Sequence, residues 1–208
     1  MLAGCSPGEV IKLHYLNGFV PGTRAIFNHT NLAVAPIEGD PRGGLREVGS
    51  VFDAKGKREK LLQVSDAEVT IHNALMAALA DAGLRPIALP QDFDAHDLPP
   101  GVDAILTCKL LELSVEKNFG VQETIHGQYF TMNSRVKLQY TVRRRDGAIL
   151  YQGDVLGVED EPPKPVGGEV FFPLETEPAE SLSVALSRAI GELIADPKFA
   201  AAFPPRAQ

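Results

Sequence analysis

The titratable side chains of this chain are scattered, and few of them have a spacing that supports chemistry. Glu123 and His126 could act as an acid and a base, but no nucleophile can be placed beside them. Gly56-Lys57 lacks the spacing of a phosphate-binding loop. The acidic stretch 92–97 lacks the Gly and Glu positions of a calcium loop. We therefore predict a protein without catalytic residues, metal or cofactor.

Cys5 is the thiol with a recognisable chemical context. Leu2-Ala3-Gly4-Cys5 has the order of a bacterial lipoprotein signal, in which Leu and two small residues precede a Cys that is alkylated by a diacylglycerol. Two lipid attachments, worth about 0.8 kcal/mol per buried methylene, would make such an anchor permanent. Ser6, rather than Asp, follows the Cys, which favours the outer membrane in the sorting pattern of enteric lipoproteins. We predict Cys5 as a lipidation site.

A working export signal also needs a basic start and an apolar run of about 7 to 15 residues. Only Met1 precedes the motif in this sequence. We therefore expect the apolar run to be encoded upstream of Met1.

Composition limits the class of partner. The 208 residues are 44% hydrophobic, which suffices for one well-buried domain. A formal net charge of −7 disfavours a nucleic-acid partner, because a phosphate backbone would be repelled. The sequence contains no apolar run of about 18 residues, so we expect membrane attachment only through the lipid on Cys5. Cys108 lies in an apolar run and is predicted to be buried and inert.

The first half of the chain predicts a tether, five short strands and a helix. The helix should run from Asp66 to Ala82, because Ser65 and Glu68 match a capping box and Gly83 suits the left-handed position after a helix. Val64 and Val69 would form a hydrophobic staple. Strands are expected within 10–16, 32–37, 48–52, 59–64 and 85–89, with 48–64 forming a hairpin.

The second half predicts a meander followed by a helix. Strands are expected at 103–116, with a bulge near Leu110 where the apolar phase shifts, then at 128–144 and 148–158. A semi-rigid, Pro-rich linker should follow at 159–168. The closing helix should begin near Pro178, with Thr176 as its cap, and end at Asp196-Pro197.

Two surface features remain as interaction candidates. The basic run 143–145 flanks the expected Asp146-Gly147 turn, where a solvated hairpin tip is favoured over a phosphate or lipid-headgroup patch. An apolar island after the Pro-rich segment either folds back on the sheet or meets a partner. That candidate partner surface consists of Val170, Phe171, Phe172 and Leu174.

The order of these elements resembles the YajG-type bacterial lipoproteins. The likeness rests on Leu-Ala-Gly-Cys5, the first strand Leu32-Ala33-Val34-Ala35-Pro36, a capped helix ending at Gly83, a long meander and a helix through Ile190. More distantly, the chain is similar to the auxiliary lipoproteins of envelope ABC transporters. The resemblance implies a two-layer fold, an envelope location and no established catalytic residues.

We therefore expect an α+β fold, a two-layer sandwich with a mainly antiparallel sheet and two amphipathic helices on one face. Residues 1–30 should be the tether, 31–203 one domain and 204–208 a tail.

The expected function is that of a lipid-anchored periplasmic accessory or binding protein in envelope maintenance or transport. We expect it on the periplasmic face of the outer membrane, with an envelope protein or transporter as partner. One alternative is a carrier of a lipophilic ligand in a cavity lined by Phe130, Leu138 and Leu186. Another is a hydrolase with Glu123 and His126 in a cleft.

Overall fold

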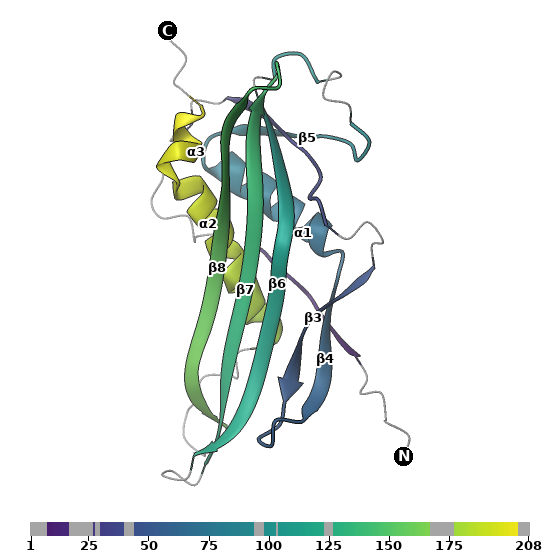
Figure 1. Cartoon of the computed structure of the whole chain (residues 1–208), viewed down its shortest axis with the longest axis vertical. Coiled ribbons are helices and arrows are strands. Elements are labelled where there is room, and N and C mark those ends of the chain that lie inside the picture. The colour runs from purple at the N-terminus through teal and green to yellow at the C-terminus, as the bar shows by residue number, and fades with distance from the viewer. Residues whose placement is uncertain are drawn as a thin grey trace.

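The protein is an elongated α+β molecule, described here from a computed structural model (Figure 1). The structure describes residues 8–16, 27, 30–39, 44–93, 98–102, 104–122, 127–166 and 177–203. The strands are β1 (Gly8–Ile11), β2 (Asn31–Val34), β3 (Leu45–Phe52), β4 (Arg58–Ser65), β5 (Arg85–Ala88), β6 (Ala104–Gln122), β7 (Gly127–Arg144) and β8 (Ile149–Val166). The helices are α1 (Ala67–Asp81), α2 (Pro178–Ala195) and α3 (Pro197–Ala201).

The eight strands form one mixed, curled sheet centred on β6. β7 pairs antiparallel along the whole of one edge of β6, and β8 pairs antiparallel with β7. The other edge of β6 is shared by two parallel neighbours, β2 near its start and β3 near its end. β5 adds to β2, whereas β4 and β1 add to β3. Four of the seven pairings are parallel, so the expectation of a mainly antiparallel sheet is wrong, and the two-layer sandwich is not confirmed.

The antiparallel meander itself follows the sequence pattern. Side chains of β7 at alternating positions, such as Phe130, Leu138 and Tyr140, are at most 1% exposed, because one face of the strand covers the core. The predicted bulge in β6 is confirmed, since the register with β7 shifts between Leu110 and Glu112. The Asp146-Gly147 turn is also confirmed, and Gly147 adopts the left-handed region with a φ of 87°.

β8 extends eight residues beyond its predicted end at Val158. The stretch 159–166, expected to be part of a linker, continues the pairing with β7 as far as Val166. The register shifts where Pro162 and Pro163 lie, so the prolines fall at a bulge of a strand that has β7 as its sheet neighbour. Proline has no N–H to donate and is tolerated at such bulges and edges.

Helix α1 forms where the sequence predicts it, but its start differs. Ser65 pairs with Leu45 as the last residue of β4, so it is held in the sheet and does not cap the helix. Asp66 instead makes a left-handed turn with a φ of 50°. Glu68 contacts Arg46 at 3.0 Å, and Val69 is 60% exposed, so neither the capping box nor the staple forms. Gly83 adopts the expected left-handed conformation with a φ of 93°.

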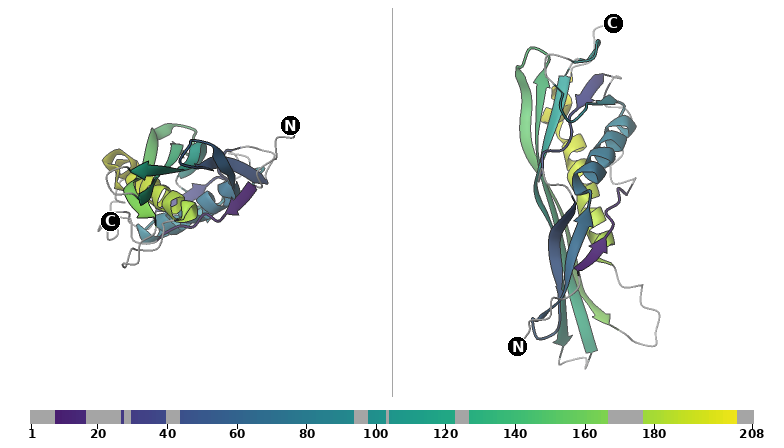
Figure 2. Two further views of the ribbon diagram at one scale, coloured as in Figure 1. Left: turned by 90° about the horizontal axis from the view of Figure 1, so that it is seen from below. Right: turned by 90° about the vertical axis from the view of Figure 1, so that its right-hand side faces the viewer.

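Helix α2 packs closely on β7 and β8 and lies beside α1 on the same side of the sheet (Figure 2). Small residues on the helix make the close approach possible, since Ser181, Ala185 and Ala189 are fully buried. Ser181 and Ser134 of β7 share a hydrogen bond of 2.7 Å in the core. The cap is Glu177 rather than Thr176, and Pro178 occupies the first turn as expected.

The segment after β1 is bound to α2 as well as to the sheet. The Ser183 hydroxyl accepts a hydrogen bond from the His14 N–H at 3.0 Å, and the Ser187 hydroxyl accepts one from the Leu16 N–H at 3.0 Å. Ile11 and Leu13 are buried in the core. Residues 8–16 of the predicted tether therefore belong to the folded unit. Among the described residues, none of the helices has the length and apolar character needed to cross a bilayer.

Candidate functional site

Most residues singled out from the sequence lie outside the described part of the chain. These are Cys5, Glu123, His126 and the partner surface formed by Val170, Phe171, Phe172 and Leu174. Cys108 is described and is 2% exposed. Burial first, and then the charge of Glu38, raises the pKa of its thiol to about 12. A thiol that stays protonated at neutral pH is a poor nucleophile, so the prediction of an inert Cys108 agrees with its surroundings.

The residues named for the carrier hypothesis are packed into the core. Phe130, Leu138 and Leu186 are at most 1% exposed and belong to one buried hydrophobic cluster. They line neither of the two pockets described below. The layer between the sheet and α2 is thus closely packed at these three positions.

The larger of those pockets, about 900 Å³, lies at the end of the molecule that carries the β7–β8 turn and α3. We call it the hairpin pocket. Its walls combine basic, hydroxyl and apolar side chains from segments far apart in the sequence. The lining residues are Thr30, Val102, Ala104, Arg144, Arg145, Leu150, Tyr151, Lys198, Ala201, Ala202 and Phe203.

The charge of the hairpin pocket is positive although the chain is acidic. Arg144, Arg145 and Lys198 are all exposed on its lining. Arg144 lies 3.6 Å from the Asp146 carboxylate, an exposed pair that water screens strongly. The turn that presents the arginines is ordered by a 2.8 Å hydrogen bond from the Arg144 N–H to the Ala148 carbonyl. Cations around an apolar floor suit a ligand with an anionic head and an apolar body.

Asp196 positions Lys198 and Tyr151 at this pocket. Its carboxylate accepts the Lys198 N–H at 2.8 Å, capping α3, and accepts the hydroxyls of Tyr151 and of Tyr140, the latter at 3.3 Å. Burial tends to raise the pKa of Asp196, but these hydrogen bonds outweigh it and hold the pKa below its ordinary value. Burial, followed by its contacts with Tyr151 and Asp196, raises the pKa of Tyr140, which therefore remains a hydrogen-bond donor.

An aromatic cluster supports the floor beneath this network. Phe199 of α3 packs edge-on against Tyr140, with ring centroids 6.1 Å apart. Phe27 and Phe203 pack edge-on against Phe199 in the same way, at 5.8 and 5.2 Å. Edge-to-face contacts at these separations are favourable. They fix α3, and with it Lys198, against the end of the sheet.

A smaller pocket of about 250 Å³ lies toward the opposite end, where α2 begins. We call it the lower pocket. Lys60 contacts Glu9 there at 2.9 Å, which joins β4 to β1 and raises the pKa of Lys60. Lys117 is 6% exposed, with its ammonium 4.5 Å from the centroid of the Phe130 ring. Within the described ranges, no group of three or more His, Cys, Asp or Glu side chains could hold a metal.

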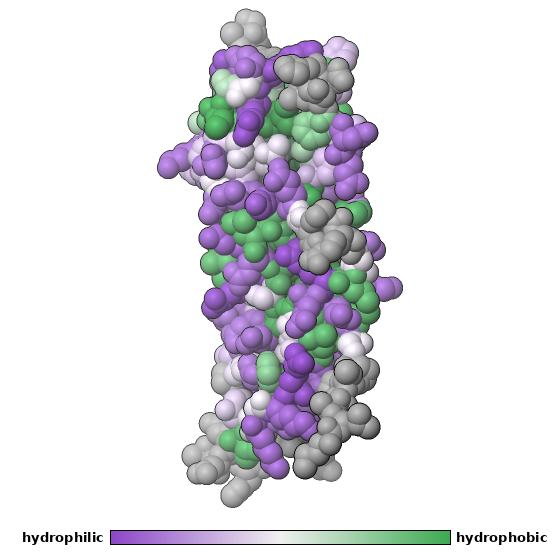
Figure 3. Space-filling view, turned by 45° about the vertical axis from the view of Figure 1, so that its right-hand side comes forward, coloured by the Kyte–Doolittle hydropathy of each residue, from purple (hydrophilic) through white to green (hydrophobic). Residues whose placement is uncertain are grey.

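Hydrophilic residues cover most of the face shown in Figure 3, with apolar residues interspersed. The sequence indicated the arginine run of the hairpin pocket but not the pocket itself. Lys198 and Thr30 approach the run only through the packing of α3 and β2, and no local pattern in the sequence signals that meeting.

Two solved structures resemble this fold. One is a Helicobacter pylori protein described as a homolog of the neuraminyllactose-binding hemagglutinin, with 10% identity, 91% of this chain and 96% of that chain covered, and a TM-score of 0.45. The other is a Neisseria meningitidis lipoprotein, with 15% identity, 63% and 83% covered, and a TM-score of 0.33. No protein-family model and no curated protein matches the sequence. TM-scores below 0.5 carry no argument about function, so the resemblance to YajG-type lipoproteins stays a prediction.

Proposed function

We propose that this protein is a bacterial lipoprotein, anchored through Cys5 at the periplasmic face of the outer membrane. There it acts as a non-catalytic accessory or binding protein in envelope maintenance or transport. The observation that carries the proposal is the sequence Leu2-Ala3-Gly4-Cys5, followed after two residues by a segment bonded to the sheet and to α2. A folded domain that begins so close to an acylated Cys is suited to work at a membrane surface.

Replacing Cys5 with serine tests the anchor. In bacteria that produce the chain behind a lipoprotein export signal ending at Cys5, the C5S variant should lose nearly all incorporation of an alkyne-tagged fatty acid. It should also move from the membrane fraction to the periplasmic fraction, because a serine hydroxyl does not replace the thiol in lipid transfer. C108S is the matched control and should keep both signals. Equal fatty-acid labelling of C5S and the unchanged protein would contradict the proposal.

A second candidate function is binding of an anionic amphiphile in the hairpin pocket. It is favoured by the combination of three cations with an apolar floor in a chain of net charge −7. The carrier hypothesis thereby shifts from the packed layer between sheet and helices to the end of the molecule. The apolar chain of the ligand would lie against Leu150 and Phe203, and its head group would meet the cations.

Charge reversal at the pocket should weaken such binding. We expect R145E/K198E to bind lysophosphatidylglycerol at least about tenfold more weakly, because each charge-assisted hydrogen bond contributes about 1.5 kcal/mol or more. Isothermal titration calorimetry below the critical micelle concentration measures the affinity. R143E is the matched control, since Arg143 is exposed on the same strand but is outside the pocket lining. Equal affinities of the double variant and the unchanged protein would rule out this site.

A further inference from the structure

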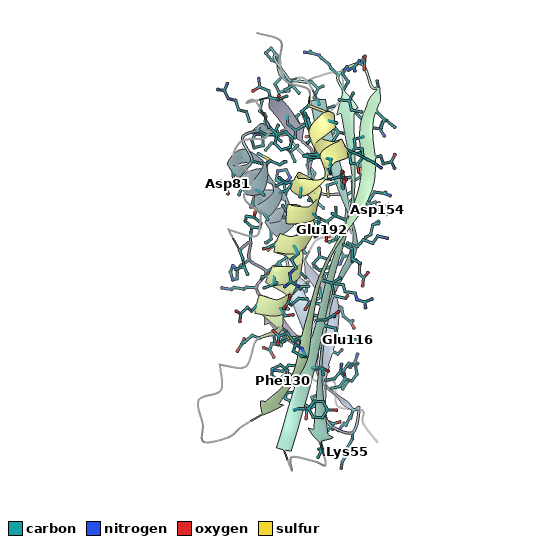
Figure 4. All side chains as sticks on the ribbon, turned by 90° about the vertical axis from the view of Figure 1, so that its left-hand side faces the viewer. Lys55, Asp81, Glu116, Phe130, Asp154 and Glu192 are labelled. Carbon is teal, nitrogen blue, oxygen red and sulfur yellow. The ribbon has the colours of Figure 1, made fainter. Side chains whose placement is uncertain are left out.

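The tip of the β3–β4 hairpin carries three cationic side chains. Lys55, Lys57 and Arg58 are exposed at this hairpin, and we call these three residues the basic tip. Lys55, labelled in Figure 4, lies near one end of the long axis. Asp53 is the one carboxylate in the stretch 53–58, so the cations predominate locally while the whole chain has a charge of −7.

The basic tip has a fixed shape. The Asp53 carboxylate accepts the Lys57 N–H at 2.8 Å and the Lys55 N–H at 2.9 Å. The Lys57 hydrogen bond is the main cause that lowers the pKa of Asp53. The Asp53 carboxylate therefore closes the turn as well as partly offsetting its positive charge. The three cationic side chains remain exposed to solvent.

The path of the chain brings this tip close to the lipid site. β1 runs parallel to β4, with Gly8 opposite Leu61. Two residues, Ser6 and Pro7, separate Cys5 from Gly8, so the Cα atom of Cys5 can lie at most about 11 Å from that of Gly8. Arg58 precedes Leu61 by three residues, which places it about 10 Å nearer the hairpin end. A bilayer that holds Cys5 is therefore within reach of the basic tip.

Strand β6, which pairs with β3, also ends near the basic tip. Phe52 pairs with Asn118, and β6 continues beyond that pair to Gln122. Val121 near this end is 61% exposed, an apolar side chain that can enter the interfacial region of a membrane. Basic and apolar side chains together are the combination that membrane-surface segments use.

We propose that the basic tip rests on anionic phospholipid head groups of the membrane that holds Cys5, an inference that depends on the proposed lipid anchor. The molecule then stands on its β3–β4 end. β6 has 19 residues and spans about 60 Å at 3.3 Å per residue, so the hairpin pocket faces away from the bilayer. The lipid fixes the protein to the membrane, and the tip fixes its orientation.

The test attaches a synthetic lipid to Cys5 in place of the lipid added in the cell. Buried Cys108 leaves Cys5 as the reactive thiol, so the full chain can be coupled to maleimide-phosphatidylethanolamine in vesicles. The vesicles contain phosphatidylcholine alone or phosphatidylcholine and phosphatidylglycerol in equal parts. Amine labelling followed by mass spectrometry reports each lysine. On the anionic vesicles, Lys55 and Lys57 should react at least about fivefold more slowly than in uncoupled protein, while Lys109 should react unchanged.

Two charge variants decide whether the tip is responsible. K55E/R58E retains Lys57 as a reporter and should lose its protection, because two cations that face the lipid become anions. R85E/R143E makes the same change of charge at exposed positions elsewhere and should keep the protection. Circular dichroism checks that both variants are folded.

Three results would overturn the inference: equal labelling of Lys57 with and without coupling, equal protection on the two vesicle types, or full protection in K55E/R58E. None of them concerns lipidation in the cell, which the C5S experiment tests separately. Equal fatty-acid labelling of C5S and the unchanged protein in cells, together with full tip protection on vesicles, would instead contradict the proposed function alone.

Discussion

Replacing Gly157 with alanine should lower the free energy of unfolding by about 4 kcal/mol, a large share of the stability of a typical domain. A Cβ at Gly157 would lie 1.8 Å from the Ala185 carbonyl oxygen and 2.6 Å from the Ala189 nitrogen. Both atoms are backbone atoms of α2, so no side-chain rotation can relieve the overlap. The helix must move away from β8, and the buried contacts along it are lost together.

Urea denaturation followed by far-ultraviolet circular dichroism measures this loss. Gly147→Ala is the matched control, since Gly147 has a φ of 87° and nothing lies within 4 Å of its Cβ position. That control should lose only about 1 kcal/mol, the cost of a left-handed conformation for a residue with a Cβ. Equal losses in the two variants would show that α2 does not depend on close contact with β8.

Asp196→Ala should destabilise the protein by about 2 to 3 kcal/mol. The substitution removes the cap of α3 and the acceptor for Tyr140 and Tyr151 together. Tyr140 is 1% exposed, so its hydroxyl loses a partner that water cannot readily replace. The half-buried position of Asp196 keeps the loss below that expected for a fully buried network.

The same residue contributes a pH dependence whose sign follows from its lowered pKa. A carboxylate with a lower pKa in the folded state stabilises the fold above its unfolded value, near 3.8, and loses that contribution as the pH falls through the folded value. Urea midpoints of the unchanged protein should therefore fall more steeply below pH 4 than those of Asp196→Asn. Parallel pH profiles would show that the carboxylate is not bound by the tyrosines in solution. Tyr151→Phe is the control that retains the α3 cap.

Local signals in the sequence located most of the elements but not their pairing. Alternation of apolar and polar residues predicted β7, and the shift of phase at Leu110 predicted the bulge of β6. Each depends on side chains two positions apart, which a strand places on one face. The α1 capping box was wrong because Ser65 satisfies the same local pattern while pairing with Leu45 in the sheet.

The pairing of β6 with β2 and β3 could not be found in this way. A parallel pair joins segments separated by a long connection, and the residues of one strand do not specify which other strand it pairs with. The extension of β8 was missed because the prolines of 159–166 predict a linker, whereas the bulge opposite β7 accommodates them. The hairpin pocket depends on such pairing, since Thr30, which precedes β2, meets residues of β6, β7, β8 and α3 in its lining.

The sequence by itself located the boundaries of α2 and the turns at Gly83 and Gly147, and it is the basis for predicting lipidation at Cys5, because each depends on residues that are neighbours in the chain. Only the tertiary structure decided what stands at the two ends of the molecule. Lys198 and Arg144 line one pocket at one end. At the other, the pairing of Gly8 with Leu61 places the start of β1 beside the strand that leaves the basic tip. Such contacts depend on packing between residues that are far apart in the chain, so they cannot be predicted from any short stretch of sequence.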